Sequence, residues 1–258
     1  MQSLIVIPIP PSLQKKMQNP FPPLDQPTTY VGPTPESNWV IPGVLLVGAF
    51  PAEIDDTITF FQLSEILKRR INKFVCLQNE YRIDAQEEMW RSGEALRPYF
   101  KDVVNIVENK DKFETFNNST VCDSAELSFV HFPIQDCGIA NDTEVLFLCQ
   151  QLVQSIYEGN RLYIHCWGGH GRTGTVVCIM LCIMYEISAE EAMERCQNVH
   201  DMREHYVDVG SPQTQIQRDQ VTRIVAMIRK PVEFTDVSVY LNFKPDEIDA
   251  LCEAVDDI

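Results

Sequence analysis

Hydrophobic and polar residues alternate along the middle of the chain in a pattern that predicts strands followed by helices. Runs rich in β-branched and aromatic residues are typical of strands, and they cover residues 44–50, 73–78, 128–134 and 161–166. Apolar residues at helical spacing predict helices over residues 55–70, 84–100, 143–159, 172–187, 189–201 and 212–229. Strands that alternate with helices indicate an α/β fold, with a central, mostly parallel sheet flanked by helices.

The N-terminal part of the chain follows a different pattern. Nine of the 16 prolines lie in the first 35 residues, which excludes regular helix or sheet ladders there and predicts an extended arm over residues 1–40. The arm could be flexible, or it could lie on the body of the protein. Three aromatic residues would make the second arrangement possible: Phe21, Tyr30 and Trp39.

The C-terminal part is acidic. Residues 232–258 contain eight acidic residues and one lysine, and the last 15 predict a short amphipathic helix. This extension could pack on the body or serve as a docking tail for a basic partner. The folded domain itself is expected over residues 41–231.

Composition narrows the classes of function. A chain of 258 residues can bury one sizeable core, and its net charge of -16 disfavours binding to nucleic acid or anionic membranes through the overall field. No apolar run reaches the length of about 18 residues that a membrane span needs. Nine cysteines without a C-x-x-C pair or zinc-like cluster favour a reduced, intracellular protein, in the cytoplasm or alternatively the nucleus, and predict no metal or cofactor.

The stretch HCWGGHGRTG, residues 165–174, joins a predicted strand to a predicted helix. Its glycines allow successive backbone amides to turn inward, and the helix begins with its positive dipole end, so the loop predicts an anion site. It lacks the lysine and hydroxyl of a nucleotide-binding P-loop. Cys166 would have its thiol pKa lowered from about 8.5 into the range of about 3.5 to 7.5, and Arg172 can hold two phosphate oxygens.

This stretch resembles the H-C-x5-R-[ST]-G signature of the cysteine-dependent protein tyrosine phosphatase superfamily. The resemblance implies a three-layer α/β domain in which Cys166 attacks phosphorus and Arg172 binds the phosphoryl group. It also implies that Thr173 stabilises the thiolate as a leaving group and that His165 orders the loop. The remaining positions of the loop would line the phosphate: Trp167, Gly168, Gly169, His170 and Gly171. By contrast, Cys178 and Cys182 lie at helical spacing in an apolar helix and are interpreted as buried packing residues.

The same resemblance implies a general acid upstream of Cys166 and a water-positioning amide side chain downstream of it. Asp136 follows a predicted strand, 30 positions before Cys166, and its F-P-I-x-D context resembles the acid loop of dual-specificity members. Asp142 is the competing acid, but its position predicts that it caps the following helix, a role for which Asn141 is the alternative. The segment QTQIQ resembles the family's Q-T-x-x-Q element, which implies that Gln213 positions the hydrolytic water, with Gln217 as the alternate.

Together these motifs are similar to the dual-specificity branch, near the cyclin-dependent kinase-associated phosphatase type. No N-R-Y type loop supplies a stacking tyrosine, and Tyr81 is interpreted as a surface residue. The loop also lacks the lysines that phosphoinositide phosphatases use, although His170 could add positive charge near pH 6.5 or below. We therefore expect a metal-independent protein phosphatase acting on phosphotyrosine, with phosphoserine and phosphothreonine as further substrates.

Two other functions remain open from the sequence. A phosphoinositide or small-molecule phosphatase would use the same catalytic residues, and a non-catalytic phosphoprotein-binding scaffold would use the anion site alone. Because thiols of low pKa are oxidation targets, Cys76 near the end of a neighbouring strand is a candidate disulfide partner for Cys166.

Overall fold

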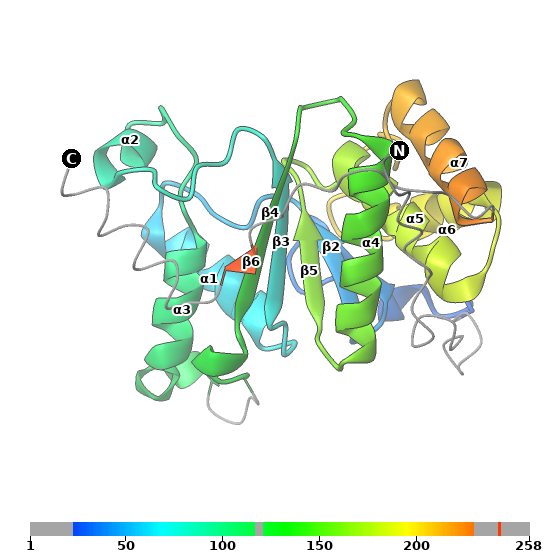
Figure 1. The fold of residues 1–258 in the computed structure, drawn as a ribbon. Helices are drawn as coiled ribbons and strands as arrows, with labels where there is room; N and C mark the ends of the chain where they lie inside the picture. The colour runs from blue at the N-terminus through cyan, green and yellow to red at the C-terminus, as the bar shows by residue number, and fades with distance from the viewer. Residues whose placement is uncertain (1–22, 117–120, 230–241, 244–258) are drawn as a thin grey trace.

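A six-stranded sheet runs through the centre of the computed structural model, which describes residues 23–116, 121–229 and 242–243 (Figure 1). The strand order is β1-β2-β5-β3-β4-β6. The four central strands are parallel, and the edge strands β1 and β6 pair antiparallel, so the mostly parallel sheet is confirmed. The strands are β1 Ser37–Ile41, β2 Leu45–Gly48, β3 Lys73–Gln78, β4 Ser128–Ile134, β5 Leu162–His165 and β6 Asn242–Phe243.

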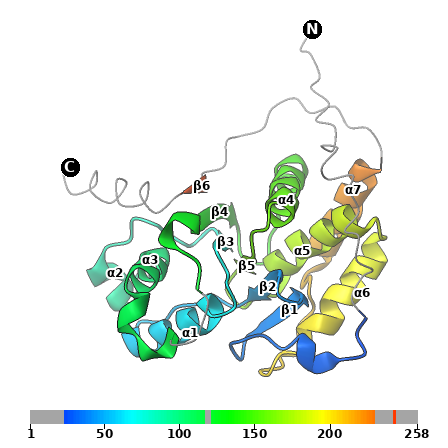
Figure 2. The same ribbon diagram turned by 90° about the horizontal axis from the view of Figure 1, so that it is seen from below.

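Helices cover both faces of this sheet, which gives the expected three layers. Figure 2 shows α1, α2 and α3 on one side and α4, α5, α6 and α7 on the other. The helices are α1 Asp56–Leu67, α2 Glu87–Arg91, α3 Phe100–Glu108, α4 Asp142–Tyr157, α5 Gly171–Tyr185, α6 Ala189–His200 and α7 Gln215–Ile228. None of the helices in the described ranges is long and apolar enough to cross a membrane.

The central helix of the second layer is α5, which directly follows the glycine-rich loop. Every residue from Gly171 to Met184 is buried, and α5 packs against α4, α6 and α7. A helix that is apolar on all sides is stable only when neighbouring elements cover it completely. The surrounding helices therefore hold the first turn of α5, and the loop before it, in one position.

Local signals in the sequence explain where the surrounding helices begin. The Asn141 side chain accepts hydrogen bonds from two backbone amides of the first turn of α4. Reciprocal capping boxes start α6, with Ser188 and Glu191, and α7, with Thr214 and Gln217. The predicted cap of α4 is thus Asn141, while Asp142 is the first helical residue.

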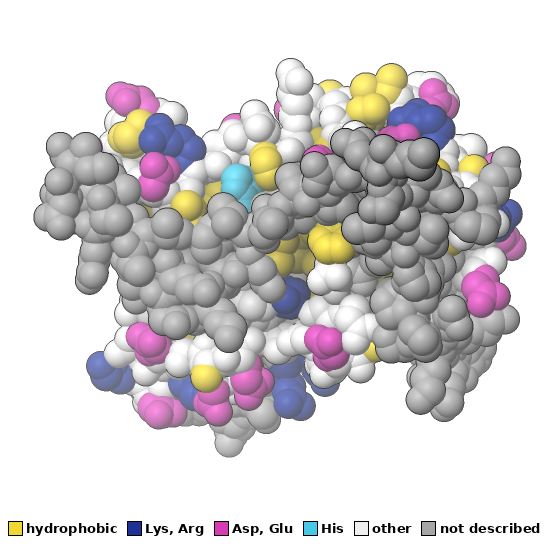
Figure 3. Space-filling model, in the orientation of Figure 1, with side chains coloured by type: hydrophobic (Ala, Val, Ile, Leu, Met, Phe, Trp, Pro, Cys, Tyr) yellow, Lys and Arg dark blue, Asp and Glu magenta, His cyan; other side chains and the backbone are white. Residues whose placement is uncertain are grey.

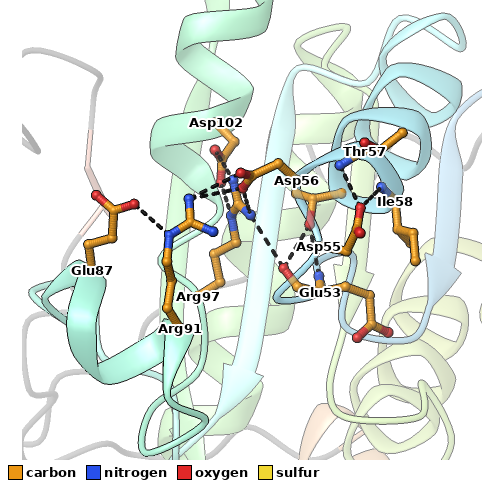
Figure 4. A network of polar contacts seen from close by, with 10 residues as sticks. Glu53, Asp55, Asp56, Thr57, Ile58, Glu87, Arg91, Arg97 and Asp102 are labelled. Atoms are coloured by element: carbon orange, nitrogen blue, oxygen red, sulfur yellow. Dashed lines mark hydrogen bonds and ion pairs between the residues drawn. The ribbon is translucent and has the colours of Figure 1, made fainter.

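The helix predicted over residues 84–100 is wrong. Only α2 forms there, and Gly93 follows it with a φ of 83°, a left-handed conformation that ends a helix. The segment after it is fixed by side chains, because the guanidinium groups of Arg91 and Arg97 lie 4.2 and 4.4 Å from the ring centroid of Trp90. Both arginines also pair with Asp56 at the start of α1 (Figure 4).

The described part of the N-terminal arm lies on the body. Tyr30 and Trp39 are buried, and the Tyr30 hydroxyl accepts a hydrogen bond of 2.7 Å from Arg195. Because β1 starts at Ser37, the predicted boundary after residue 40 is too late, and the last part of the arm is an edge strand. Phe21 lies outside the described residues, as does the predicted helix of the acidic extension.

Charged side chains on the face drawn in Figure 3 form small separate groups, and lysines and arginines mostly lie beside acidic residues. No continuous basic surface is visible on that face.

Candidate active site

The glycine-rich loop leaves the sheet at the carboxyl end of β5, one of its central strands. In the sheet register, His165 lies opposite Gly48 of β2 on one side and Cys76 of β3 on the other. Cys166 follows directly and is 3% exposed. The carboxyl ends of parallel strands are where α/β sheets form their binding crevices, so the topology alone places Cys166 at such a crevice.

The backbone carbonyl groups of residues 167–170 all accept hydrogen bonds from other parts of the protein. The Trp167 carbonyl accepts from the Phe50 amide at 2.8 Å, and the His170 carbonyl accepts from the Gly174 amide at 2.8 Å and the Ser211 hydroxyl at 3.2 Å. The two carbonyls between them accept hydrogen bonds from the guanidinium of the buried Arg203.

The amide groups of the loop have the opposite environment. Within the part of the chain that the structure describes, no N–H group of residues 167–172 donates to a protein acceptor. Six consecutive amides without a protein acceptor, and the positive end of the α5 dipole, therefore follow directly after Cys166 in the chain. This arrangement is suited to a tetrahedral oxyanion.

Arg172 is buried beside this ring of amides and is held by two carboxylates. Its Nη1 and Nη2 donate to Glu80 at 2.9 and 3.0 Å, and Nη2 also donates to Asp136 at 2.9 Å. Burial opposes the charge, but the hydrogen bonds to Glu80 and the nearby negative groups raise the Arg172 pKa. Conversely, Glu80 is partly buried, which raises its pKa, yet pairing with Arg172 lowers it overall. Sequence reasoning missed Glu80, since nothing in the local sequence QNEYR points toward residue 172.

Asp136 lies just after β4, and its side chain is 70% exposed, so the carboxylate is accessible from solvent. The loop that carries it is tied to α7, because Thr214 Oγ1 donates to the Cys137 carbonyl at 3.3 Å and Gln217 Nε2 to the Gly138 carbonyl at 3.0 Å. The structure therefore brings Asp136 to the same edge of the sheet as the glycine-rich loop.

Asp142 is engaged elsewhere. Its carboxylate accepts from Gln220 at 2.8 Å and from Arg223 at 2.9 and 3.0 Å, which links α4 to α7. Partial burial raises its pKa, but the bonds to Arg223 and Gln220 lower it overall. Asp142 is thus a structural residue at the start of α4, although the helix cap predicted for it is Asn141 instead.

The two glutamines singled out in the sequence both lie over the first turn of α5. A Cβ atom built on Gly171 would be 2.6 Å from Gln217 Oε1 and 3.1 Å from Gln213 Cβ. Gln217 is fully buried, and both ends of its amide are used, by the Thr214 amide and the Gly138 carbonyl. Gln213 is exposed. A side chain at residue 171 would therefore displace the amide of Gln217.

His165 and Thr173 flank the loop from inside the protein. His165 Nδ1 lies 3.3 Å from the Cys166 carbonyl, which can only accept, so Nδ1 carries the proton and Nε2 accepts from the Tyr99 hydroxyl at 2.7 Å. Burial lowers the His165 pKa to about 3, so the imidazole is neutral. Thr173 Oγ1 is buried and has no hydrogen-bond partner among the described residues.

His170 does not carry the positive charge expected near pH 6.5. Its Nδ1 is 2.7 Å from His200 Nε2, and burial, the charge of Arg203 and His200 lower its pKa to about 4. His170 is therefore neutral at physiological pH. The interpretation of Tyr81 as a surface residue is also wrong, since it is 2% exposed and packs against Tyr99.

A cavity of about 420 Å³ adjoins the loop on the side of Trp167. Trp167 is 60% exposed and stacks on Phe50 with ring centroids 6.3 Å apart. The walls of the cavity combine apolar side chains with charged side chains of both signs. The apolar ones include Phe50, Ile54, Trp90 and Trp167, and the charged ones are Glu36, Glu53, Arg97 and Arg203. Its volume lies within the range of small-molecule and side-chain binding pockets.

Comparison with known proteins agrees with this geometry. Residues 34–220 match the family model described as PTP-SAK: Swiss Army Knife protein, DSP-PTPase phosphatase domain. The chain belongs to this family of phosphatase domains, which lies in the dual-specificity branch expected from the sequence.

Two curated viral proteins are similar to part of the chain. "Putative tyrosine phosphatase 197R" of Invertebrate iridescent virus 6 is 34% identical over 99 residues, which is 37% of this chain and 31% of that protein. "Putative tyrosine phosphatase 067L" of Invertebrate iridescent virus 3 is 31% identical over 85 residues, or 31% of this chain and 35% of that protein. The matched segment spans about a third of the length of each relative.

Solved phosphatase structures are also similar to this chain. A glycine-to-alanine mutant of Tk-PTP superposes with a TM-score of 0.50 at 20% identity and covers 76% of this chain and 97% of that one. Kinase associated phosphatase, with its catalytic cysteine replaced by serine, has a TM-score of 0.49 at 17% identity, covering 72% and 88%. At such identities the likeness of Tk-PTP establishes the fold alone.

Proposed function

We propose that this phosphatase domain hydrolyses phosphomonoesters on phosphoproteins, with phosphotyrosine as its first substrate, through a phosphocysteine intermediate. One observation carries the proposal: the six amides of residues 167–172, next to Cys166, have no acceptor among the described residues, and Arg172 already holds the Asp136 carboxylate at 2.9 Å. A nucleophile, a phosphate cradle and an acid thus share one site.

In the first step, the Cys166 thiolate attacks phosphorus and forms an S–P bond as the P–O bond to the substrate breaks. The electron pair goes to the leaving oxygen, and protonated Asp136 donates its proton there. Phosphate oxygens bind the loop amides and Arg172. Because Asp136 and an incoming phosphate compete for Arg172 Nη2, phosphate binding frees the Asp136 side chain to reach the leaving group.

In the second step, water attacks the phosphocysteine, the S–P bond breaks, and inorganic phosphate leaves. Asp136, now a carboxylate, takes the proton from the water. Gln213 orients that water, since its exposed amide can donate and accept at once, whereas the amide of Gln217 is already bonded at both ends. The Thr173 hydroxyl, buried and unpaired among the described residues, stabilises the departing thiolate.

The loop favours a singly phosphorylated protein side chain over a phosphoinositide. Its variable positions contain no lysine or arginine, and the neutral His170 adds no charge for a second phosphate. The adjoining cavity, lined by Ile54, Trp90 and Trp167, supplies an apolar surface for residues beside the phosphorylated one. A reactive thiol also requires a reducing compartment, so we place the activity inside the cell.

Phosphate release from a substrate panel tests the proposal. The panel contains phosphotyrosine, phosphoserine and phosphothreonine peptides, phosphoinositide vesicles and inositol phosphates. We expect the highest kcat/KM on phosphotyrosine peptides and a phosphorylated Cys166 when the intermediate is trapped by acid quenching and mass spectrometry.

Cys166→Ser is the decisive variant, with Cys178→Ser in α5 as the matched control. Cys166→Ser should release no phosphate while still binding phosphopeptide, and Cys178→Ser should retain turnover. Normal hydrolysis by Cys166→Ser would refute the mechanism. Binding of phosphopeptides by the unaltered chain without any turnover would instead identify a scaffold, and preference for lipid substrates would identify a phosphoinositide phosphatase.

A further inference from the structure

A buried arginine outside the signature supports the phosphate loop from behind. Arg203 follows α6 and is 5% exposed. Its guanidinium donates three hydrogen bonds, from Nη1 to the Gly168 carbonyl at 2.9 Å, from Nη2 to the Gly169 carbonyl at 2.9 Å, and from Nε to Asn38 Oδ1 at 2.8 Å. All three acceptors are neutral.

The charge of Arg203 has no direct counter-ion within the described ranges, where no carboxylate lies within ion-pair distance. The buried Arg172 and the nearly buried Arg97, by comparison, each bind carboxylates. A buried unpaired cation costs several kcal/mol, so it persists only where other groups stabilise it. Burial lowers the Arg203 pKa, while Tyr163, Cys166, Cys196 and Glu36 act in the opposite direction.

The two carbonyl contacts determine the direction of two amides. A peptide group is planar and trans, so its carbonyl and the following N–H point in opposite directions. Holding the Gly168 carbonyl outward therefore turns the Gly169 N–H inward, and holding the Gly169 carbonyl outward turns the His170 N–H inward. These are two of the six unpaired amides beside Cys166.

This support matters because glycines would otherwise permit the peptide groups to flip. Gly169 has a φ of 70°, and a Cβ built on it would lie 2.2 Å from the Gly48 carbonyl oxygen, so residue 169 must be glycine. Glycine has little intrinsic preference between the two orientations of a peptide plane. The Arg203 fork selects the orientation that directs amides toward the anion.

We propose that Arg203 is a positioning residue for phosphate binding, which orients the Gly169 and His170 amides and places a buried positive charge behind the bound phosphate. The inference rests on the proposed phosphatase function, because it assigns a second cation to the same anion site. Bound phosphate, or the Cys166 thiolate, is then the negative group that the Arg203 charge otherwise lacks.

Binding of inorganic phosphate and orthovanadate, measured by isothermal titration calorimetry, tests this role. Losing two hydrogen bonds from a charged donor should weaken phosphate binding by about 10- to 100-fold in Arg203→Met. Arg203→Lys keeps the charge but cannot bridge both carbonyls, so its loss should be smaller. Arg195→Met is the matched control, since Arg195 is a buried arginine of α6 that bonds to Tyr30, and its phosphate Kd should stay within about twofold.

Two readouts separate positioning from general structural support. A merely structural arginine would lower the melting temperature equally with and without phosphate, whereas a positioning arginine also reduces the stabilisation that phosphate confers. In wild-type protein, phosphate should shift the amide NMR signals of Gly169 and His170, and these shifts should be lost in Arg203→Met. Arg203→Lys supplies the same comparison if Arg203→Met does not fold.

The outcomes are distinguishable from failure of the proposed function. If the wild-type chain binds neither phosphate nor vanadate, the phosphatase proposal fails. If wild-type protein binds both and a folded Arg203 variant binds them within twofold of wild type, only the inference about Arg203 is overturned.

Discussion

Replacing Glu80 with glutamine is expected to weaken substrate binding by releasing Arg172 from its fixed orientation. The Glu80 carboxylate accepts from both terminal nitrogens of the guanidinium, at 2.9 and 3.0 Å, while Arg172 is 2% exposed. Glutamine has nearly the same shape but offers one acceptor oxygen and no charge. The Glu80→Gln variant therefore removes the charged half of the pair without creating a cavity.

The size of the expected loss in kcat/KM follows from how deeply Glu80 and Arg172 are buried. Removing one member of a fully buried ion pair costs about 3 to 5 kcal/mol. The Glu80 side chain is 40% exposed, and Arg172 keeps its bonds to Asp136 and the Ile134 carbonyl, so we expect a smaller loss. About 2 kcal/mol corresponds to a decrease of about 30-fold in kcat/KM.

The pH dependence of stability provides a second measure. Pairing with Arg172 places the Glu80 pKa in the folded protein below its value of about 4.3 in the unfolded chain. The stabilisation from Glu80 is therefore complete above that unfolded value and is lost as pH falls through the folded pKa. Glu80→Gln should be less stable at pH 7 but should lose less stability on acidification.

Steady-state kinetics with para-nitrophenyl phosphate measure the loss in kcat/KM. Urea unfolding at several pH values measures the change in the pH dependence of stability. Glu65→Gln is a suitable control, since Glu65 of α1 forms a half-buried i,i+3 pair with Lys68, which makes no contact with Arg172. Unchanged kcat/KM in Glu80→Gln, with Arg172 still bound to Asp136, would show that Glu80 does not orient the guanidinium.

Three further variants test other parts of the site. Asp136→Asn should lower kcat by about 100-fold or more on phosphotyrosine peptides, and by less on substrates with good leaving groups. Asp142→Asn should stay active. Equal losses of kcat in the two variants would show that Asp136 is not the acid. Gly169→Ala should abolish phosphate binding and destabilise the fold, because the added Cβ would meet the Gly48 carbonyl. Gly43 has a φ of 73° but no atom near the position of a Cβ, so Gly43→Ala should lower the free energy of unfolding in urea by only about 1 kcal/mol. Because the His165 pKa is about 3 when folded and about 6.5 when unfolded, its neutral form stabilises the protein above pH 6.5. That contribution to the free energy of unfolding falls as pH drops from 6.5 toward 3. In His165→Gln, urea unfolding at several pH values should give a plot of unfolding free energy against pH whose slope in this range is smaller by the equivalent of about one bound proton. An unchanged slope would contradict this reasoning.

Most of the regular structure followed from local patterns. The strands predicted at residues 73–78 and 128–134 have the same bounds in the structure, because both are apolar runs that end at polar turns. β1 was hidden by the prolines that precede it, and the helix predicted at 84–100 stops at Arg91 because a left-handed glycine and a network of ion pairs override its apolar spacing.

By itself the sequence predicted the strand, glycine-rich loop and helix that carry Cys166 and Arg172, since both residues lie within one continuous segment with local signals. The tertiary structure alone decided what holds that loop in shape. Glu80 comes from the turn after β3 and Arg203 from the segment after α6, and neither position carries a local signal. Their contacts depend on strand order and on helix packing, which join residues that are 92 and 35 positions apart in the chain. Such pairings are set by burial of the whole core, so local residue patterns do not reveal them.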